Sequence, residues 1–125
     1  MLTPEHMIAT VHAYVDAFEK GDPEAVVGLF SEDATVEDPV GTPAKEGHEM
    51  IRAFYTGSMQ TGAKLHLQGP VRVGANYAAF AFQVRLTWEG NMSTIDVIDI
   101  FHFHPNGKVA KMEAYFGPTN FSTVS

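Results

Sequence analysis

Residues 80–103 read FAFQVRLTWEGNMSTIDVIDIFHF, two runs of alternating apolar and polar residues on either side of Glu89–Gly90–Asn91. Alternation with a period of two is typical of strands that bury one face, and a glycine-containing turn between two such runs predicts a β-hairpin. Further turn signals occur at residues 74–76 and 105–107. We therefore predict a meander of antiparallel strands, with outer strands at 65–73, bent at Gly69–Pro70, and at 108–116.

The N-terminal half shows helical spacing instead. Apolar residues recur at i, i+3 and i+4 from Met7 to Phe18, after a Thr3–Pro4 start and before a stop at Gly21. Asp22–Pro23 predicts a short second helix through Phe30, residues 34–37 a brief extended piece, and residues 47–55 a third helix. The whole pattern predicts a single α+β domain over residues 1–125, with three N-terminal helices packed on one face of a curved antiparallel sheet.

Composition excludes several classes of function. The 125 residues carry a formal net charge of −7, which argues against nucleic-acid and anionic-membrane partners. The absence of Cys excludes disulfide scaffolds, thiolate metal sites and cysteine nucleophiles, and it fits a cytoplasmic protein. Neither a signal peptide nor an apolar run of about 20 residues, long enough to cross a membrane, is visible. The chemistry must then come from carboxylates, hydroxyls and imidazoles.

Asp99 interrupts the apolar face of its predicted strand. Alternation places it on the same face as Val97 and Phe101, whereas Arg72 and Arg85 fall on the polar faces of their strands. A carboxyl group in apolar surroundings without a cationic partner has a raised pKa and stays protonated, so that it becomes a hydrogen-bond donor. We therefore interpret Asp99 as a candidate functional acid. The alternative is a structural role, in which it pairs with a buried Arg or caps the backbone.

Three further polar residues stand out. Tyr14 lies on the apolar stripe of the first helix, so its hydroxyl group needs a buried partner, and Tyr55 beside Phe54 invites the same interpretation. Asp38 precedes Pro39, which holds its backbone extended and its side chain in a defined direction. Taken singly, core tyrosines and a turn-forming Asp are the simpler explanations.

Other chemistries lack their signatures. The six His show no metal-ligand spacing, and His102 and His104 are better explained as solvent-exposed side chains beside the turn at Pro105. Neither a nucleophile elbow nor a phosphate-binding glycine-rich loop occurs.

Five segments together resemble the bacterial ketosteroid isomerases. They are ATVEDPVG (34–41) with Tyr14 before it, DVID (96–99), AFYTG (53–57), GPVR (69–72) and AYFG (114–117), and the resemblance covers essentially the whole chain. It implies a cone-shaped barrel of the nuclear-transport-factor-2-like type, a homodimer packed through its sheets, a 3-oxo-steroid substrate and no cofactor. The alternatives that remain open are a polyketide-cyclase-like enzyme and a non-catalytic carrier of hydrophobic ligands on the same fold.

The resemblance also assigns roles to residues. Asp38 matches the general base, Tyr14 and protonated Asp99 match the donors of the oxyanion hole, and Tyr55 matches a tyrosine that supports Tyr14. Phe30 departs from the branch in which another tyrosine extends this chain of hydroxyl groups. Expected substrate-binding positions in the aromatic and aliphatic wall are Phe54, Phe82, Trp88, Met112 and Phe116.

Overall fold

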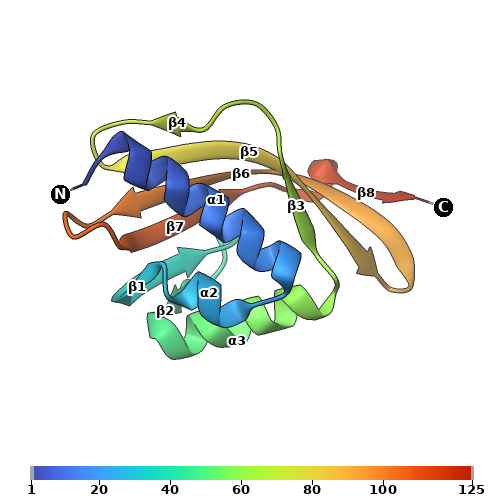
Figure 1. The fold of residues 1–125 in the computed structure, drawn as a ribbon. Helices are drawn as coiled ribbons and strands as arrows, with labels where there is room; N and C mark the ends of the chain where they lie inside the picture. The colour runs from blue at the N-terminus through green and yellow to red at the C-terminus, as the bar shows by residue number, and fades with distance from the viewer. Residues whose placement is uncertain (1, 125) are drawn as a thin grey trace.

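The structure is a computed structural model and describes residues 2–124. Three helices precede most of the strands, as Figure 1 shows. The elements are α1 (Pro4–Lys20), α2 (Pro23–Val27), β1 (Phe30–Glu37), β2 (Lys45–Glu46), α3 (Gly47–Gln60), β3 (Lys64–Leu67), β4 (Arg72–Val73), β5 (Tyr77–Trp88), β6 (Asn91–Phe103), β7 (Val109–Tyr115), a 3-10 turn at Pro118–Asn120 and β8 (Phe121–Val124).

The sheet confirms the predicted hairpin and adds a parallel pair. The described strands follow the order β2-β1-β7-β6-β5-β3, with β4 on β5 and β8 on β6. β5 and β6 pair in register from Tyr77↔His102 to Trp88↔Asn91. β1 runs parallel to β7, so the sheet is mixed rather than wholly antiparallel as predicted. The alternation of residues within each strand could not predict this parallel pair, because it joins two segments that are far apart in the sequence.

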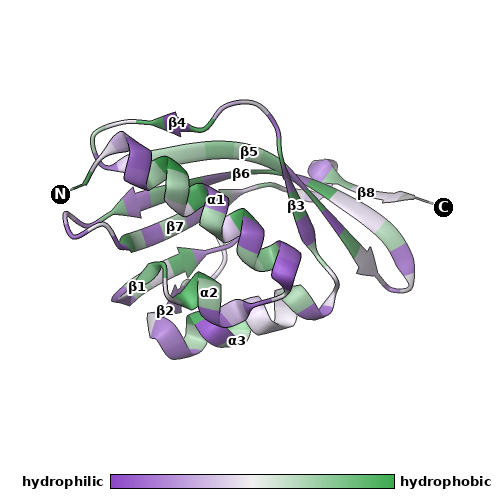
Figure 2. Cartoon of the chain, viewed as in Figure 1, coloured by the Kyte–Doolittle hydropathy of each residue, from purple (hydrophilic) through white to green (hydrophobic). Residues whose placement is uncertain are grey.

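The helices lie on one side of the curved sheet, as predicted, and α1 crosses the strands (Figure 1). Thr3 accepts a hydrogen bond from the backbone N–H of His6 at the start of α1, and Gly21 ends the helix at φ 64°. Figure 2 shows the alternation of hydropathy along β6 and β7. The apolar residues of these strands form the core together with buried residues of α1, including Val11 and Tyr14.

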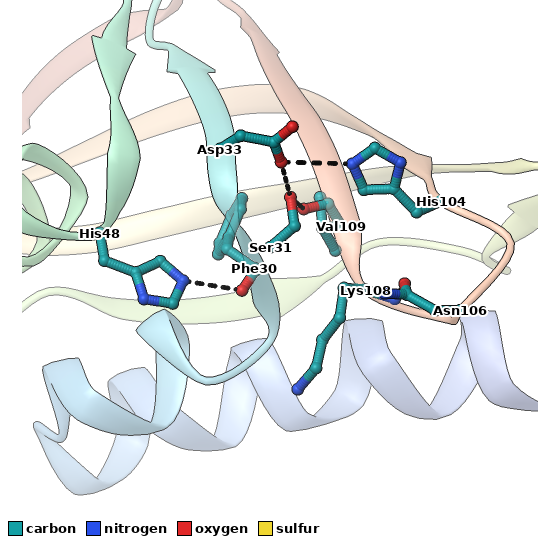
Figure 3. Close-up of polar contacts among 8 residues, drawn as sticks. All are labelled: Phe30, Ser31, Asp33, His48, His104, Asn106, Lys108 and Val109. Carbon is teal, nitrogen blue, oxygen red and sulfur yellow. Dashed lines mark hydrogen bonds and ion pairs between the residues drawn. The ribbon is translucent and has the colours of Figure 1, made fainter.

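Polar contacts fasten the start of β1 to its neighbours (Figure 3). His48 of α3 donates a hydrogen bond through Nε2 to the carbonyl oxygen of Phe30, 2.8 Å away. Ser31 donates to the carboxylate of Asp33, which also pairs with His104 at 3.4 Å. The β1–β7 register shifts between Phe30 and Thr35, so these contacts brace an irregular stretch of β1. The ion pair with Asp33 gives His104 a structural role at the surface.

Several predicted boundaries were wrong. The second helix ends at Val27, not Phe30, because Gly28 interrupts the apolar run and Phe30 already belongs to β1. The third helix continues beyond Tyr55 to Gln60. The short strands β2 and β8 were not predicted. Within residues 2–124, no helix has the length and apolar character required to cross a membrane.

Candidate functional site

A cavity of about 540 Å³ opens between the helices and the concave face of the sheet, a volume within the range of small-molecule sites. Its wall is mostly apolar, and its hydroxyl and carboxyl groups come from α1, α3, β6, the loop after β1 and Thr61 just after α3. The lining residues are Tyr14, Phe18, Asp38, Ala53, Phe54, Tyr55, Gly57, Ser58, Thr61, Ala63, Leu65, Phe82, Val84, Leu86, Trp88, Ile95, Val97, Asp99 and Phe116. Four residues singled out from the sequence, Tyr14, Asp38, Tyr55 and Asp99, thus meet at one cavity.

Asp99 lies on the inner face of β6, between Phe80 of β5 and Ala114 of β7. Its exposed fraction is 1%, and its Oδ1 atom has no hydrogen-bond partner within residues 2–124. Burial raises the pKa of Asp99 well above its usual value, and the nearby charge of Asp38 raises it further. The raised pKa favours the protonated form of Asp99, whose carboxyl group can donate a hydrogen bond to a ligand.

The loop after β1 places Asp38 at the cavity. The N–H of Val40 donates to the carbonyl oxygen of Ala114 at 2.8 Å, which ties the loop to the residue opposite Asp99. Glu37 does not line the cavity, and its carboxylate accepts a hydrogen bond of 2.9 Å from the N–H of Gly41. Asp38 is half-buried, and burial raises its pKa to about 6, against an opposing effect of the Lys45 charge. At pH 7 most Asp38 carboxyls are ionised and can accept a proton.

Tyr14 and Tyr55 form a buried pair of hydroxyl groups. Their Oη atoms are 2.9 Å apart, and burial raises the pKa of both phenols well above 10. The ring of Tyr14 packs edge-on against Phe101 at 5.2 Å, next to Asp99 on the inner face of β6. When Tyr55 donates to Tyr14, the Tyr14 proton remains available to the cavity. The ring centroids of Phe30 and Tyr55 are 6.2 Å apart. Phe30 carries no hydroxyl group, so it does not continue the chain of hydroxyl groups beyond Tyr55.

Most of the predicted aromatic wall faces the cavity. Phe54, Phe82, Trp88 and Phe116 line it, although Trp88 is half-exposed at the β5–β6 turn. Met112 departs from the prediction: it is fully buried in the core and does not belong to the lining. It lies opposite Phe101, one inward-facing position beyond Asp99.

Several lining residues were not predicted from the sequence. Ser58 and Thr61 add hydroxyl groups near the end of α3, and Phe18 lies one turn after Tyr14 on α1. The signal was present for Phe18, which shares the apolar stripe of Tyr14. Ser58 follows Phe54 at i+4, so it would have been found had the third helix been predicted at its full length.

The cavity offers proton-transfer chemistry between carboxyl and hydroxyl groups. The described residues contain no cluster of three or more His, Asp or Glu able to hold a metal ion. No Arg lines the cavity, and Arg72 and Arg85 are exposed as predicted. The arrangement can remove a proton with Asp38 and stabilise the resulting oxyanion with Tyr14 and Asp99.

The chain is similar in sequence and in fold to known proteins. A model of the SnoaL-like domain matches residues 11–112. The chain is 36% identical to a steroid Delta-isomerase from Nocardioides simplex over 111 residues, which cover 88% of this chain and 89% of that protein. It is also similar to the solved structure of SalBIII, described as an epoxide hydrolase/cyclase-like enzyme in pyran ring formation in polyether salinomycin. That similarity has a TM-score of 0.93 and 25% identity, and it covers 99% of this chain and 100% of the other.

Proposed function

Because the chain belongs to the steroid Delta-isomerase family and carries a SnoaL-like domain, we propose that it moves the double bond of a 3-oxo-Δ5-steroid into conjugation with the ketone. The membership makes it a ketosteroid-isomerase-like enzyme of nuclear-transport-factor-2-like fold. The observation that carries the specific reaction is the pairing of two carboxyl groups in one apolar cavity. The pKa of Asp38 is about 6, whereas burial raises the pKa of Asp99 well above its usual value, and the Oδ1 atom of Asp99 has no hydrogen-bond partner among the described residues.

The reaction needs only proton transfer. The hydrogen between the ketone and the alkene is weakly acidic, and Asp38 removes it to form a dienolate. Negative charge then concentrates on the former ketone oxygen, where Tyr14 and Asp99 donate hydrogen bonds in a site that excludes water. Asp38 returns the same proton two carbons further along the steroid. No net oxidation occurs, and the base is regenerated.

The apolar wall accounts for binding. Phe54, Phe82 and Phe116 present flat surfaces that match a polycyclic hydrocarbon. At ~25 cal/mol per Å² of buried apolar area, enclosing such a ligand contributes several kcal/mol with few hydrogen bonds. Ligand binding therefore depends on shape and burial, and the polar residues are free to act on the ketone end.

The direct test is formation of a conjugated enone from 5-androstene-3,17-dione, followed by ultraviolet absorbance. We expect rapid, saturable turnover by the purified protein. A carrier would bind the steroid without producing the enone. A cyclase-like enzyme, the second candidate favoured by the likeness to SalBIII, would likewise leave this substrate unchanged. The absence of Arg from the cavity lining argues against an epoxide hydrolase built on an Asp–Arg–Asp cluster.

The pH dependence follows from the state of Asp38. Only its ionised form accepts a proton, so kcat/KM should be constant above about pH 7 and fall as the pH drops through about 6. At pH 5 the expected value is roughly one tenth of the plateau. Initial rates between pH 4.5 and 8.5 in buffers of constant ionic strength measure this limb. A rate that stays flat down to pH 5 would remove Asp38 from the role of base.

We also propose that the protein forms a homodimer through the outer face of its sheet. Apolar side chains gather there: Ile98 is 49% exposed and lies opposite Tyr115, which is 43% exposed. Light scattering should give twice the 13.7 kDa chain mass for the parent protein and a single chain mass for Ile98→Glu. Met50→Glu, on the exposed face of α3, is the matched control and should stay dimeric. A monomeric parent protein at micromolar concentration would contradict the proposal.

A further inference from the structure

Lys45 lies beside the loop that carries Asp38, on the inner side of the sheet. It belongs to the two-residue strand β2 and is the antiparallel register partner of Val36 on β1. Directly paired residues in adjacent strands project to the same face, and Val36 is completely buried. Asp38 begins the loop that follows Glu37 at the end of β1, and its side chain lines the same cavity as Phe54.

An aromatic ring of the cavity holds the Lys45 ammonium group. Its Nζ atom lies 4.7 Å from the centroid of the Phe54 ring, a cation–π contact, and Phe54 lines the cavity together with Asp38. Within residues 2–124, Lys45 forms no hydrogen bond through its side chain and no direct ion pair. Its charge is therefore not neutralised by a surface carboxylate, unlike that of Arg52, which pairs with Glu24.

The electrostatic surroundings of Asp38 are otherwise unfavourable to its anion. Asp99 faces it from β6, Tyr14 from α1 and Tyr55 from α3, and none of the three carries a positive charge. Burial raises the pKa of Asp38, and the Lys45 ammonium group lowers it. Lys45 is thus the cation that compensates part of the desolvation of the base.

We propose that Lys45 is a positioning residue for the reaction: its ammonium group, held over Phe54, favours the carboxylate form of Asp38. The inference rests on the proposed function, in which the ionised form of Asp38 removes the proton. In this arrangement β2, a two-residue strand, serves to bring one positive charge to the inner face of the sheet. Lys45 touches neither the ketone nor the transferred proton, and it acts through Asp38.

The test compares four variants. Lys45→Met and Lys45→Gln remove the charge, Lys45→Arg keeps it, and Lys20→Met removes an equal charge from the exposed last turn of α1. For the two neutral Lys45 variants we expect the acid limb of kcat/KM to move to higher pH, with a roughly threefold loss at pH 5 and little loss at pH 8. Lys45→Arg and Lys20→Met should retain the parent profile.

A second readout does not depend on isomerase activity. Carbon-13 NMR of labelled Asp carboxyls in the ligand-free protein follows the titration of Asp38, identified by its absence in Asp38→Asn. An upward shift in both neutral Lys45 variants, absent in Lys45→Arg and Lys20→Met, supports the inference even if the assay shows that another reaction is catalysed. An unchanged Asp38 titration in the neutral variants, or an equal shift in Lys20→Met, overturns it.

Discussion

Replacing Asp38 by Asn is expected to lower kcat by about 10³-fold while leaving steroid binding nearly intact. The amide has almost the same shape as the carboxylate but cannot accept the proton that must leave carbon. Turnover is measured by enone absorbance with a β,γ-unsaturated 3-ketosteroid. Binding is measured by quenching of Trp88 fluorescence, because Trp88 is the only tryptophan and lines the cavity.

Glu37→Gln is the matched control for this substitution. Glu37 is the adjacent carboxylate, but it accepts the N–H of Gly41 and does not line the cavity. Glutamine keeps an oxygen acceptor for that N–H, so the loop should persist and kcat should change little. Equal turnover by Asp38→Asn and the parent protein would refute the assignment of the base. A loss in Glu37→Gln as large as in Asp38→Asn would show that loop geometry, not proton transfer, limits the rate.

The inward direction of Asp99 could be predicted from sequence because β6 is paired along its length. Regular antiparallel partners on β5 and β7 keep its alternation strict around Asp99, so counting by two from Val97 to Phe101 gives the correct face. The inward direction of Tyr14 could be predicted equally well, because α1 is a regular helix with one apolar stripe. Regular elements preserve the periodicity on which such reasoning depends.

The meeting of these residues at one cavity could not be predicted from periodicity. It requires α1 to cross the sheet and β1 to pair with β7 in parallel, and both are contacts between segments distant in the chain. The mostly apolar residues 26–30 are equally compatible with helix and strand, and only the pairing of Phe30 with Val109 assigns Phe30 to β1. The second half of α3 was not predicted because it contains Gly57, a residue of poor helix propensity. Tertiary packing beside the cavity overrides that propensity.

The second large effect is expected at the oxyanion hole. Tyr14→Phe and Asp99→Leu each remove one hydrogen-bond donor from the position of developing charge, and each should lower kcat by about 10²–10³-fold. The interaction strengthens in the transition state, so KM should change far less than kcat. Steady-state kinetics at pH 8, where Asp38 is ionised, separates the two parameters. A variant that raised only KM would be missing a binding contact instead.

Stability measurements distinguish a functional acid from a structural one at Asp99. Its Oδ1 atom is buried without a partner, so Asp99→Leu should increase the free energy of unfolding by about 1–3 kcal/mol at pH 7. Because folding raises the pKa of Asp99, the parent protein loses stability as the pH rises above about 4, the ordinary value for an unfolded Asp. The advantage of Asp99→Leu should therefore widen from pH 4 to pH 8 in urea titrations.

Asp16→Leu provides the matched change at an exposed position of α1, away from the proposed dimer face, where neither kcat nor the free energy of unfolding should change strongly. Slower turnover combined with greater stability in Asp99→Leu is the expected signature of an acid that is retained for its chemistry. If Asp99→Leu instead kept its kcat, or unfolded more easily at every pH, the carboxyl group would be part of the packing. The oxyanion hole would then have to be sought around Tyr14 alone.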